Sequence, residues 1–232
     1  MSPRAAVAFD ATGTLIEPTE SVGAVYARVA REYGVDLPAW RLEDGFRRIL
    51  RHAGPRGLDG EDEEARREGE IAWWLEVIRQ TFQATDSTAR FSDFRGFAGA
   101  LFDAYRASGA WRARAGAVDA LDELRARSVP MGVVSNFDHR LPEILEGVGI
   151  IDYFDSIETP CRHGRAKPDA ALFSASAAAL GIAMDRLVYV GDDAEEVLAA
   201  IRGLGIAVVD VRALDAPEDL SGAVEAALGD PT

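Results

Sequence analysis

The stretch Val7–Leu15 constrains the fold most strongly, because an apolar run leads directly into a carboxylate and then into a tight turn. It reads Val-Ala-Phe-Asp-Ala-Thr-Gly-Thr-Leu. The apolar residues predict a buried β-strand, and Gly13 relaxes the backbone just beyond it. We therefore expect Asp10 at the carboxyl end of a strand, which is where ligands bind in open α/β sheets.

Downstream of Gly116 the hydrophobic pattern alternates between helix and strand. The predicted helices are Val118–Arg127 and Leu141–Val148, and the predicted strands are Met131–Val134, Leu187–Val190 and Ile206–Val209. This alternation is typical of a parallel sheet with crossover helices. The predicted fold class is therefore α/β, with a doubly wound, Rossmann-like parallel sheet.

Four apolar stripes at helical spacing lie between the first strand and this region. They run over residues 22–33, 42–50, 71–82 and 94–105 and predict four consecutive amphipathic helices. If the first strand belongs to the later sheet, residues 16–110 are an insertion, and residues 1–15 and 111–232 form the α/β core. We expect the insertion to act as a four-helix cap over the strand ends.

The composition indicates a small-molecule enzyme. The 232 residues carry a net charge of -14 with a pI of about 4.7, so the chain would repel nucleic acid and anionic membranes. A single cysteine, Cys161, excludes an internal disulfide framework, and neither a signal peptide nor a long apolar span is evident. These features favour a cytoplasmic protein, either a monomer or a homodimer.

Polar residues follow each later segment. Ser135-Asn136 follows one predicted strand, Lys167-Pro168-Asp169 opens an Ala-rich helix, and Gly191-Asp192-Asp193 ends another strand. In a doubly wound sheet these ends can converge with Asp10 on one crevice. Two carboxylates, a hydroxyl, an ammonium and the backbone amides after Asp10 form a set that suits phosphoryl transfer.

Charge assigns roles within this set. A phosphate dianion is repelled by a carboxylate nucleophile, and Mg²⁺ shared by Asp10 and Asp192 would neutralise both. Lys167, Ser135 and backbone N–H groups would hold the phosphoryl oxygens. Each motif is weak alone, but their order and their position after strands strengthen the interpretation.

These motifs resemble those of the haloacid dehalogenase superfamily. The matching pieces, in the family's order, are Asp10–Leu15, Val134–Asn136, Ala166–Asp169 with Leu172-Phe173, and Val190–Asp193. The resemblance covers residues 5 to about 210 and includes a helical insertion similar to the family's α-helical cap. It implies a Mg²⁺-dependent phosphatase that acts on a small phosphorylated metabolite.

The resemblance also implies individual roles. Asp10 would be the nucleophile that becomes a phospho-aspartate, and Asp10, the Thr12 carbonyl and Asp192 would hold Mg²⁺. Ser135 and Lys167 would bind the phosphoryl group, with Lys167 also neutralising Asp10. Thr14 and Asn136 would support the loop or the substrate, and Thr12 would lie against the substrate.

Two positions depart from the usual phosphatase pattern. Thr12 stands where an Asp normally protonates the leaving oxygen and then activates water, and a threonine hydroxyl does not titrate near neutral pH. Val197 stands where a second carboxylate commonly supports the water shell of the metal, with Glu196 or Asp193 as nearby substitutes. We expect slow turnover, most of all on poor leaving groups, and weakened Mg²⁺ binding.

Two alternatives stay open at this point. A catalytically impaired member would bind a phosphometabolite or a protein partner without turnover, as the loss of both carboxylates suggests. A hydrolase of the dehalogenase type would act on a non-phosphate substrate through an aspartyl ester. The sequence does not identify the substrate or the cap residues that face the site.

Overall fold

The computed structural model describes residues 5–54, 56, 58–107 and 109–229, and the chain divides into two compact units. One unit comprises Met1–Glu17 and Arg112–Thr232, and the other comprises Pro18–Trp111. The boundary runs through two short strands that pair with each other, β2 (Ile16–Pro18) and β3 (Trp111–Ala113). Each unit is described by itself below.

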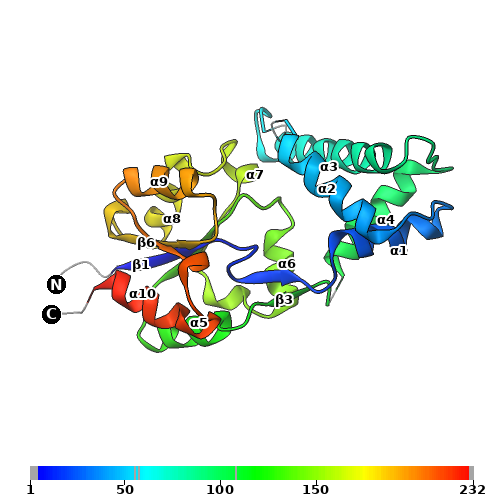
Figure 1. Cartoon of the computed structure of the whole chain (residues 1–232). Coiled ribbons are helices and arrows are strands. Elements are labelled where there is room, and N and C mark those ends of the chain that lie inside the picture. Colours follow the sequence, from blue (N-terminus) through cyan, green and yellow to red (C-terminus); the bar gives the residue numbers. More distant parts are fainter. Residues whose placement is uncertain (1–4, 55, 57, 108, 230–232) are drawn as a thin grey trace. The chain divides into compact units, whose positions relative to one another are not determined.

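A five-stranded parallel sheet forms the centre of the first unit (Figure 1). Its order is β5-β4-β1-β6-β7, so the N-terminal strand lies in the middle. The strands are β1 (Ala6–Phe9), β4 (Met131–Val134), β5 (Ser156–Glu158), β6 (Leu187–Gly191) and β7 (Ala207–Asp210). Because all four pairings are parallel, the carboxyl ends of the strands lie at one edge.

Helices cover both faces of this sheet, as the doubly wound prediction requires. In Figure 1, α8 (Ala170–Ala179) and α9 (Glu195–Gly203) lie above the sheet, and α5 (Ala117–Ala126) and α10 (Leu220–Leu228) lie below it. Side chains of α8 and α9 share one buried cluster with β1 and β6. The unit also contains α6 (Leu141–Val148), α7 (Pro160–His163) and four 3₁₀ turns, Ile151–Tyr153, Met184–Arg186, Val211–Ala213 and Pro217–Asp219.

The fold class is therefore confirmed, and several element predictions are close. Helix α6 has the predicted bounds, and β6 extends one residue beyond them. Strand β5 was not predicted. It is only three residues long and contains Glu158, whose buried carboxylate accepts hydrogen bonds from Ser156 and His163.

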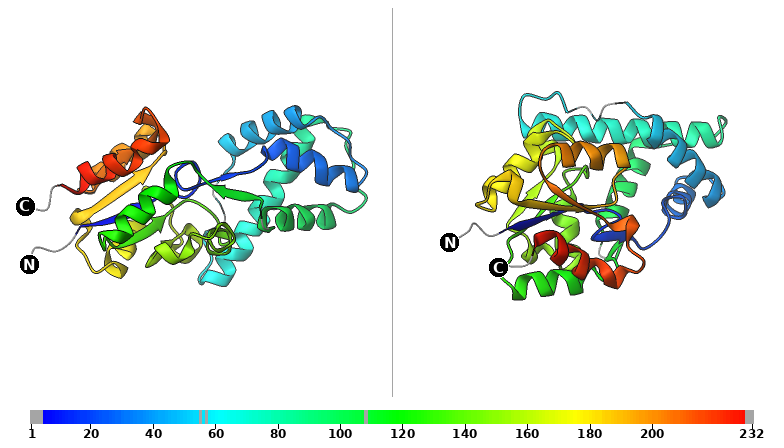
Figure 2. Two further views of the ribbon diagram at one scale, coloured as in Figure 1. Left: turned by 90° about the horizontal axis from the view of Figure 1, so that it is seen from below. Right: turned by 60° about the vertical axis from the view of Figure 1, so that its left-hand side comes forward.

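The second unit is built from four helices that correspond to the four predicted stripes. They are α1 (Val22–Glu32), α2 (Ala39–His52), α3 (Glu63–Thr85) and α4 (Phe94–Arg106). Ser21 caps α1 by accepting a hydrogen bond from the Ala24 amide, and Gly34 (φ +81°) follows its last turn. The turned views of Figure 2 show these helices in blue to green.

Aromatic rings fill the core of the helical unit. Phe82 is 2% exposed, stacks on Tyr26 at 5.9 Å and meets Phe97 edge-on at 5.1 Å. None of its residues belongs to the buried cluster that β1 and β6 share with α8 and α9. Within the described ranges, no helix of either unit has both the length and the apolar composition needed to cross a membrane.

Candidate active site

Asp10 stands at the carboxyl end of the central strand β1. Its backbone N–H donates to the Val190 carbonyl at 2.8 Å, which fixes it beside the end of β6. The residue is 7% exposed. A buried carboxylate needs a partner, because an unpaired charge in a low-dielectric environment is costly.

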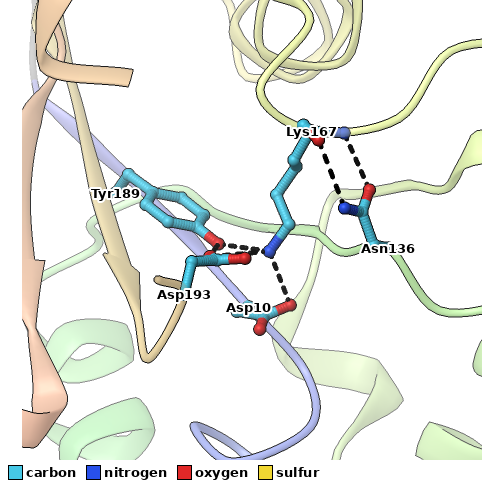
Figure 3. Close-up of polar contacts among 5 residues, drawn as sticks. All are labelled: Asp10, Asn136, Lys167, Tyr189 and Asp193. Carbon is cyan, nitrogen blue, oxygen red and sulfur yellow. Dashed lines mark hydrogen bonds and ion pairs between the residues drawn. The ribbon is translucent and has the colours of Figure 1, made fainter. Parts of the chain in front are cut away.

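Lys167 supplies that partner. Its ammonium lies 3.0 Å from Asp10 Oδ1 and 2.9 Å from Asp193 Oδ2, and the lysine side chain is 1% exposed. Figure 3 shows Asp10 and Asp193 converging on the ammonium from two different strand ends. The predicted pairing of Asp10 with Lys167 is therefore present in the structure.

Asn136 holds the backbone on which Lys167 sits. Its side-chain Oδ1 accepts a hydrogen bond from the Lys167 N–H at 2.7 Å, and its Nδ2 donates to the Lys167 carbonyl at 3.3 Å (Figure 3). The Asn136 amide thus contacts the main chain of the lysine at both ends. A contact of Asn136 with substrate stays a prediction.

Asp192 lies against the loop that follows Asp10. A Cβ atom at Gly13 would stand 2.1 Å from Asp192 Oδ2, so only glycine permits this approach, and Gly13 has a φ of +84°. Burial, reinforced by the charges of Asp10 and Asp193, raises the pKa of the Asp192 carboxyl above its ordinary value. The site therefore has an excess of negative charge beside Asp192.

Most backbone N–H groups of the loop after Asp10 already donate hydrogen bonds. The N–H groups of Gly13, Thr14, Leu15 and Ile16 donate to carbonyls within the loop. The amides of Ala11 and Thr12 take no part in these bonds, so we expect them to be the backbone donors for a phosphoryl oxygen. The Thr12 residue itself is exposed.

Two other predicted residues are buried close to the strand ends. Ser135 directly follows β4, the neighbour of β1, and is 3% exposed. Thr14 is 2% exposed, and its Oγ1 finds no hydrogen-bond partner among the described residues. Among the described residues, neither side chain is hydrogen-bonded to Asp10 or Lys167, so their roles stay predictions.

Val197 stands at the position where a second carboxylate was expected. Val197 lies on α9 and packs against the apolar cluster of the sheet, while Asp193 forms an ion pair with Lys167. Of the two nearby substitutes that the sequence offered, Asp193 is therefore engaged by the lysine. Glu196 is exposed on the first turn of α9.

Sequence reasoning missed Tyr189. Its hydroxyl donates to Asp193 Oδ2 and accepts from the Lys167 ammonium, both at 2.5 Å. Burial, followed by the charges of Asp10 and Asp193, raises the pKa of the Tyr189 phenol well above its ordinary value, so the phenol stays protonated. The available signal was a phenol in an otherwise apolar strand, two residues before the Gly-Asp-Asp turn and hence on the same face as Gly191.

Comparisons with known proteins agree with this arrangement. The chain is 32% identical to the human haloacid dehalogenase-like hydrolase domain-containing protein 3 over 178 residues, which is 71% of this chain and 64% of the human protein. The chain thus spans less than two thirds of that relative's length.

Solved structures share the fold at low identity. A hydrolase of the same superfamily from Deinococcus radiodurans R1, with bound phosphate and sodium, superposes with a TM-score of 0.59 at 24% identity and covers 100% of this chain and 90% of that chain. An L-2-haloacid dehalogenase superposes with a TM-score of 0.65 at 20% identity, covering 93% and 89%.

A family model supplies the assignment. The model of the haloacid dehalogenase-like hydrolases matches residues 5–203, which span strands β1, β4, β5 and β6, the helical insertion and every strand-end motif described above. The chain therefore belongs to the haloacid dehalogenase-like hydrolase family.

Proposed function

We propose that this protein is a Mg²⁺-dependent phosphatase that acts on a small phosphate monoester through Asp10. The observation that carries the proposal is the buried Asp10 carboxylate at the end of β1, with the Lys167 ammonium 3.0 Å away. The ammonium offsets the negative charge of the nucleophile, which lowers its repulsion of an incoming phosphate dianion.

The acidic residues of the site suit a hard cation. Among the described residues no cluster of three or more His, Cys, Asp or Glu side chains is arranged to hold a metal ion. Mg²⁺, however, commonly binds through one or two carboxylates, with waters and substrate phosphate completing its shell. Asp10, Asp192 and the Thr12 carbonyl would hold it, and the raised pKa of Asp192 indicates unmet negative charge there. When bound, Mg²⁺ would neutralise the carboxylates and polarise a phosphoryl oxygen.

The residues of the chain would divide the reaction into two displacements. An Asp10 carboxylate oxygen attacks phosphorus, a P–O bond forms, and the bond to the leaving oxygen breaks. Water then attacks phosphorus, which releases orthophosphate and restores Asp10. Ser135 and the amides of Ala11 and Thr12 would hold the phosphoryl oxygens during both steps.

Thr12 limits both displacements. The leaving oxygen needs a proton in the first step, and the attacking water must lose one in the second. General acid–base assistance contributes about 10²- to 10⁴-fold to such steps. We therefore expect slow turnover that favours substrates with good leaving groups.

One other function has support from specific positions. Thr12 is exposed and not ionisable, and Val197 packs in the apolar cluster, so neither supplies the usual carboxylate. A protein of this kind could bind a phosphometabolite or a protein partner without hydrolysing it. It would be stabilised by phosphate compounds while releasing no phosphate.

The test is phosphate release from para-nitrophenyl phosphate, acetyl phosphate and a panel of sugar and nucleotide monophosphates, with and without Mg²⁺. We expect release that requires both Mg²⁺ and Asp10, so Asp10→Asn abolishes it. Asp36→Asn is the matched control, because the Asp36 side chain is 77% exposed and forms a surface ion pair with Arg31 at 3.2 Å.

The outcomes separate the two functions. Mg²⁺-dependent release that survives Asp10→Asn would contradict the assigned nucleophile. Thermal stabilisation by orthophosphate or substrate, without release from any compound in the panel, would replace the phosphatase proposal with the binding function.

A further inference from the structure

Lys167 is the only lysine among the 25 Lys and Arg residues of the chain. The one lysine ammonium of the sequence is thus placed in the candidate active site, where its side chain is 1% exposed. Every observation specific to a lysine amine therefore reports on this site alone.

The ammonium has three partners within the protein. It donates hydrogen bonds to the Tyr189 hydroxyl at 2.5 Å and to Asp193 Oδ2 at 2.9 Å, and it forms an ion pair with Asp10 Oδ1 at 3.0 Å. The two hydrogen bonds hold the ammonium beside Asp10, where its charge offsets that of the carboxylate.

The Tyr189 phenol is held independently of the lysine. Its ring is fully buried and meets Phe173 edge-on at 5.4 Å. A Cβ atom at Gly191 would stand 2.8 Å from the phenol oxygen, so the ring lies along the strand in the space that glycine leaves. The hydroxyl is therefore fixed by packing at the point where it contacts both Asp193 and Lys167.

We propose that Tyr189 and Asp193 are positioning residues that keep the Lys167 ammonium on Asp10. Asp193 supplies a second negative charge, and the Tyr189 hydroxyl accepts a hydrogen bond from the ammonium and donates one to the Asp193 carboxylate. The gain for catalysis rests on the proposed phosphatase function, whereas the geometric role of Tyr189 does not.

A single-lysine protein permits a direct test of this geometry. With ¹⁵N incorporated only in lysine, the side-chain spectrum of the full chain contains one NH₃⁺ signal, protected from exchange because the group is buried and bonded. Tyr189→Phe removes one oxygen atom and keeps the ring. We expect the signal to shift and its hydrogen exchange to quicken about tenfold or more, the effect of losing one hydrogen bond to a charged group.

Tyr153→Phe is the matched control, because the Tyr153 hydroxyl donates to Asp122 at 2.7 Å on the surface. It should leave the lysine signal unchanged. A folded Tyr189→Phe protein whose lysine signal and exchange rate equal those of the wild type would overturn the proposal.

The catalytic arm measures kcat and KM for para-nitrophenyl phosphate with Mg²⁺. Tyr189→Phe should lower kcat about 10- to 100-fold with little change in KM, because a displaced ammonium offsets the charge of Asp10 less well in the transition state. Combining Tyr189→Phe with Asp193→Asn should cost less than the sum of the single effects, since both act on one ammonium. Unchanged kcat despite an altered lysine signal would refute the catalytic role.

The two arms fail separately. If the wild-type protein hydrolyses nothing, the phosphatase proposal fails, yet the lysine spectrum still decides whether Tyr189 positions the ammonium. If the wild type is active and Tyr189→Phe leaves the lysine spectrum unchanged, only the positioning role fails.

Discussion

Single residues decide how well this site performs its chemistry. Asp10 and Lys167 provide a neutralised nucleophile, but the position two residues after Asp10 holds an exposed threonine. A threonine hydroxyl neither donates a proton readily to an alkoxide nor accepts one from water near neutral pH. The proposed phosphatase is therefore limited by proton transfer and not by the placement of the nucleophile.

Replacing this residue provides the prediction at this scale. Thr12→Asp should raise kcat at least about tenfold on a sugar phosphate, where the leaving oxygen needs a proton, and less on para-nitrophenyl phosphate. Steady-state kinetics on the two substrates measure the difference. Thr12→Asn is the control, because it has the shape of Asp without the titratable group. Equal gains from both variants would show that shape, not proton transfer, limits the rate.

At the scale of elements, a buried ion pair stabilises the loop that follows β4. Arg140 donates to Asp138 through Nε at 2.8 Å and Nη2 at 2.6 Å, and this side-chain pair is 10% and 1% exposed. The pair stabilises the turn that carries Ser135 and Asn136 toward the site. Arg212 makes the same two hydrogen bonds to Asp210 at the end of β7, but there the side chains are 44% and 19% exposed.

The two ion pairs have the same spacing in the sequence and differ in burial, so comparing them isolates the effect of burial. Asp138→Asn should destabilise the protein by about 3 kcal/mol, because it removes the carboxylate charge that faces the buried Arg140 guanidinium at 2.6 Å. Asp210→Asn should cost less than about 1 kcal/mol, since solvent screens the exposed pair. Chemical denaturation of both variants gives the comparison. Similar losses of unfolding free energy in the two variants would mean that burial does not govern the strength of these ion pairs.

The same pair sets a pH dependence. Burial alone raises the pKa of Asp138, but the hydrogen bonds and charge of Arg140 outweigh it, so the pKa lies below its ordinary value. A lowered folded pKa contributes stability that is present above the unfolded value of about 3.9 and is lost as pH falls through the folded value. Wild type and Asp138→Asn should therefore converge in stability at acidic pH.

At the scale of the whole molecule, each of the two units has a buried hydrophobic cluster of its own among the described residues. The parallel sheet buries one cluster with α8 and α9, and the four inserted helices bury another around Phe82 and Phe97. Because each unit has its own core, we expect local stability to differ between them. The helical unit is proposed as a cap whose side chains select the substrate.

A core substitution in one unit tests this independence. Phe82→Ala should destabilise the helical unit by about 3–5 kcal/mol, because it leaves a cavity among three aromatic rings. Hydrogen exchange should then accelerate in α1, α3 and α4 but not in β1 or β6. Trp40→Ala is the control, since Trp40 is 68% exposed. Equal acceleration in β1 and β6 would indicate that the two units unfold as one.

The sequence by itself determined the α/β class, the four inserted helices and the strand-end placement of Asp10. These features follow from local periodicity, and from the rule that parallel strands gather their carboxyl ends at one edge. Helix α6 was predicted to the residue because its apolar stripe ends at a helix-terminating glycine, Gly149.

Only the tertiary structure decided what the charged residues contact. Strand β5 was missed because Glu158 reads as a surface residue until Ser156 and His163 satisfy its carboxylate. Tyr189 reads as an ordinary strand residue until the fold brings Lys167 and Asp193 to its hydroxyl. The contact between Lys167 and Tyr189 joins residues 22 positions apart, and the shorter-range contacts depend on where individual side chains point. Hydrophobic periodicity carries no information about either.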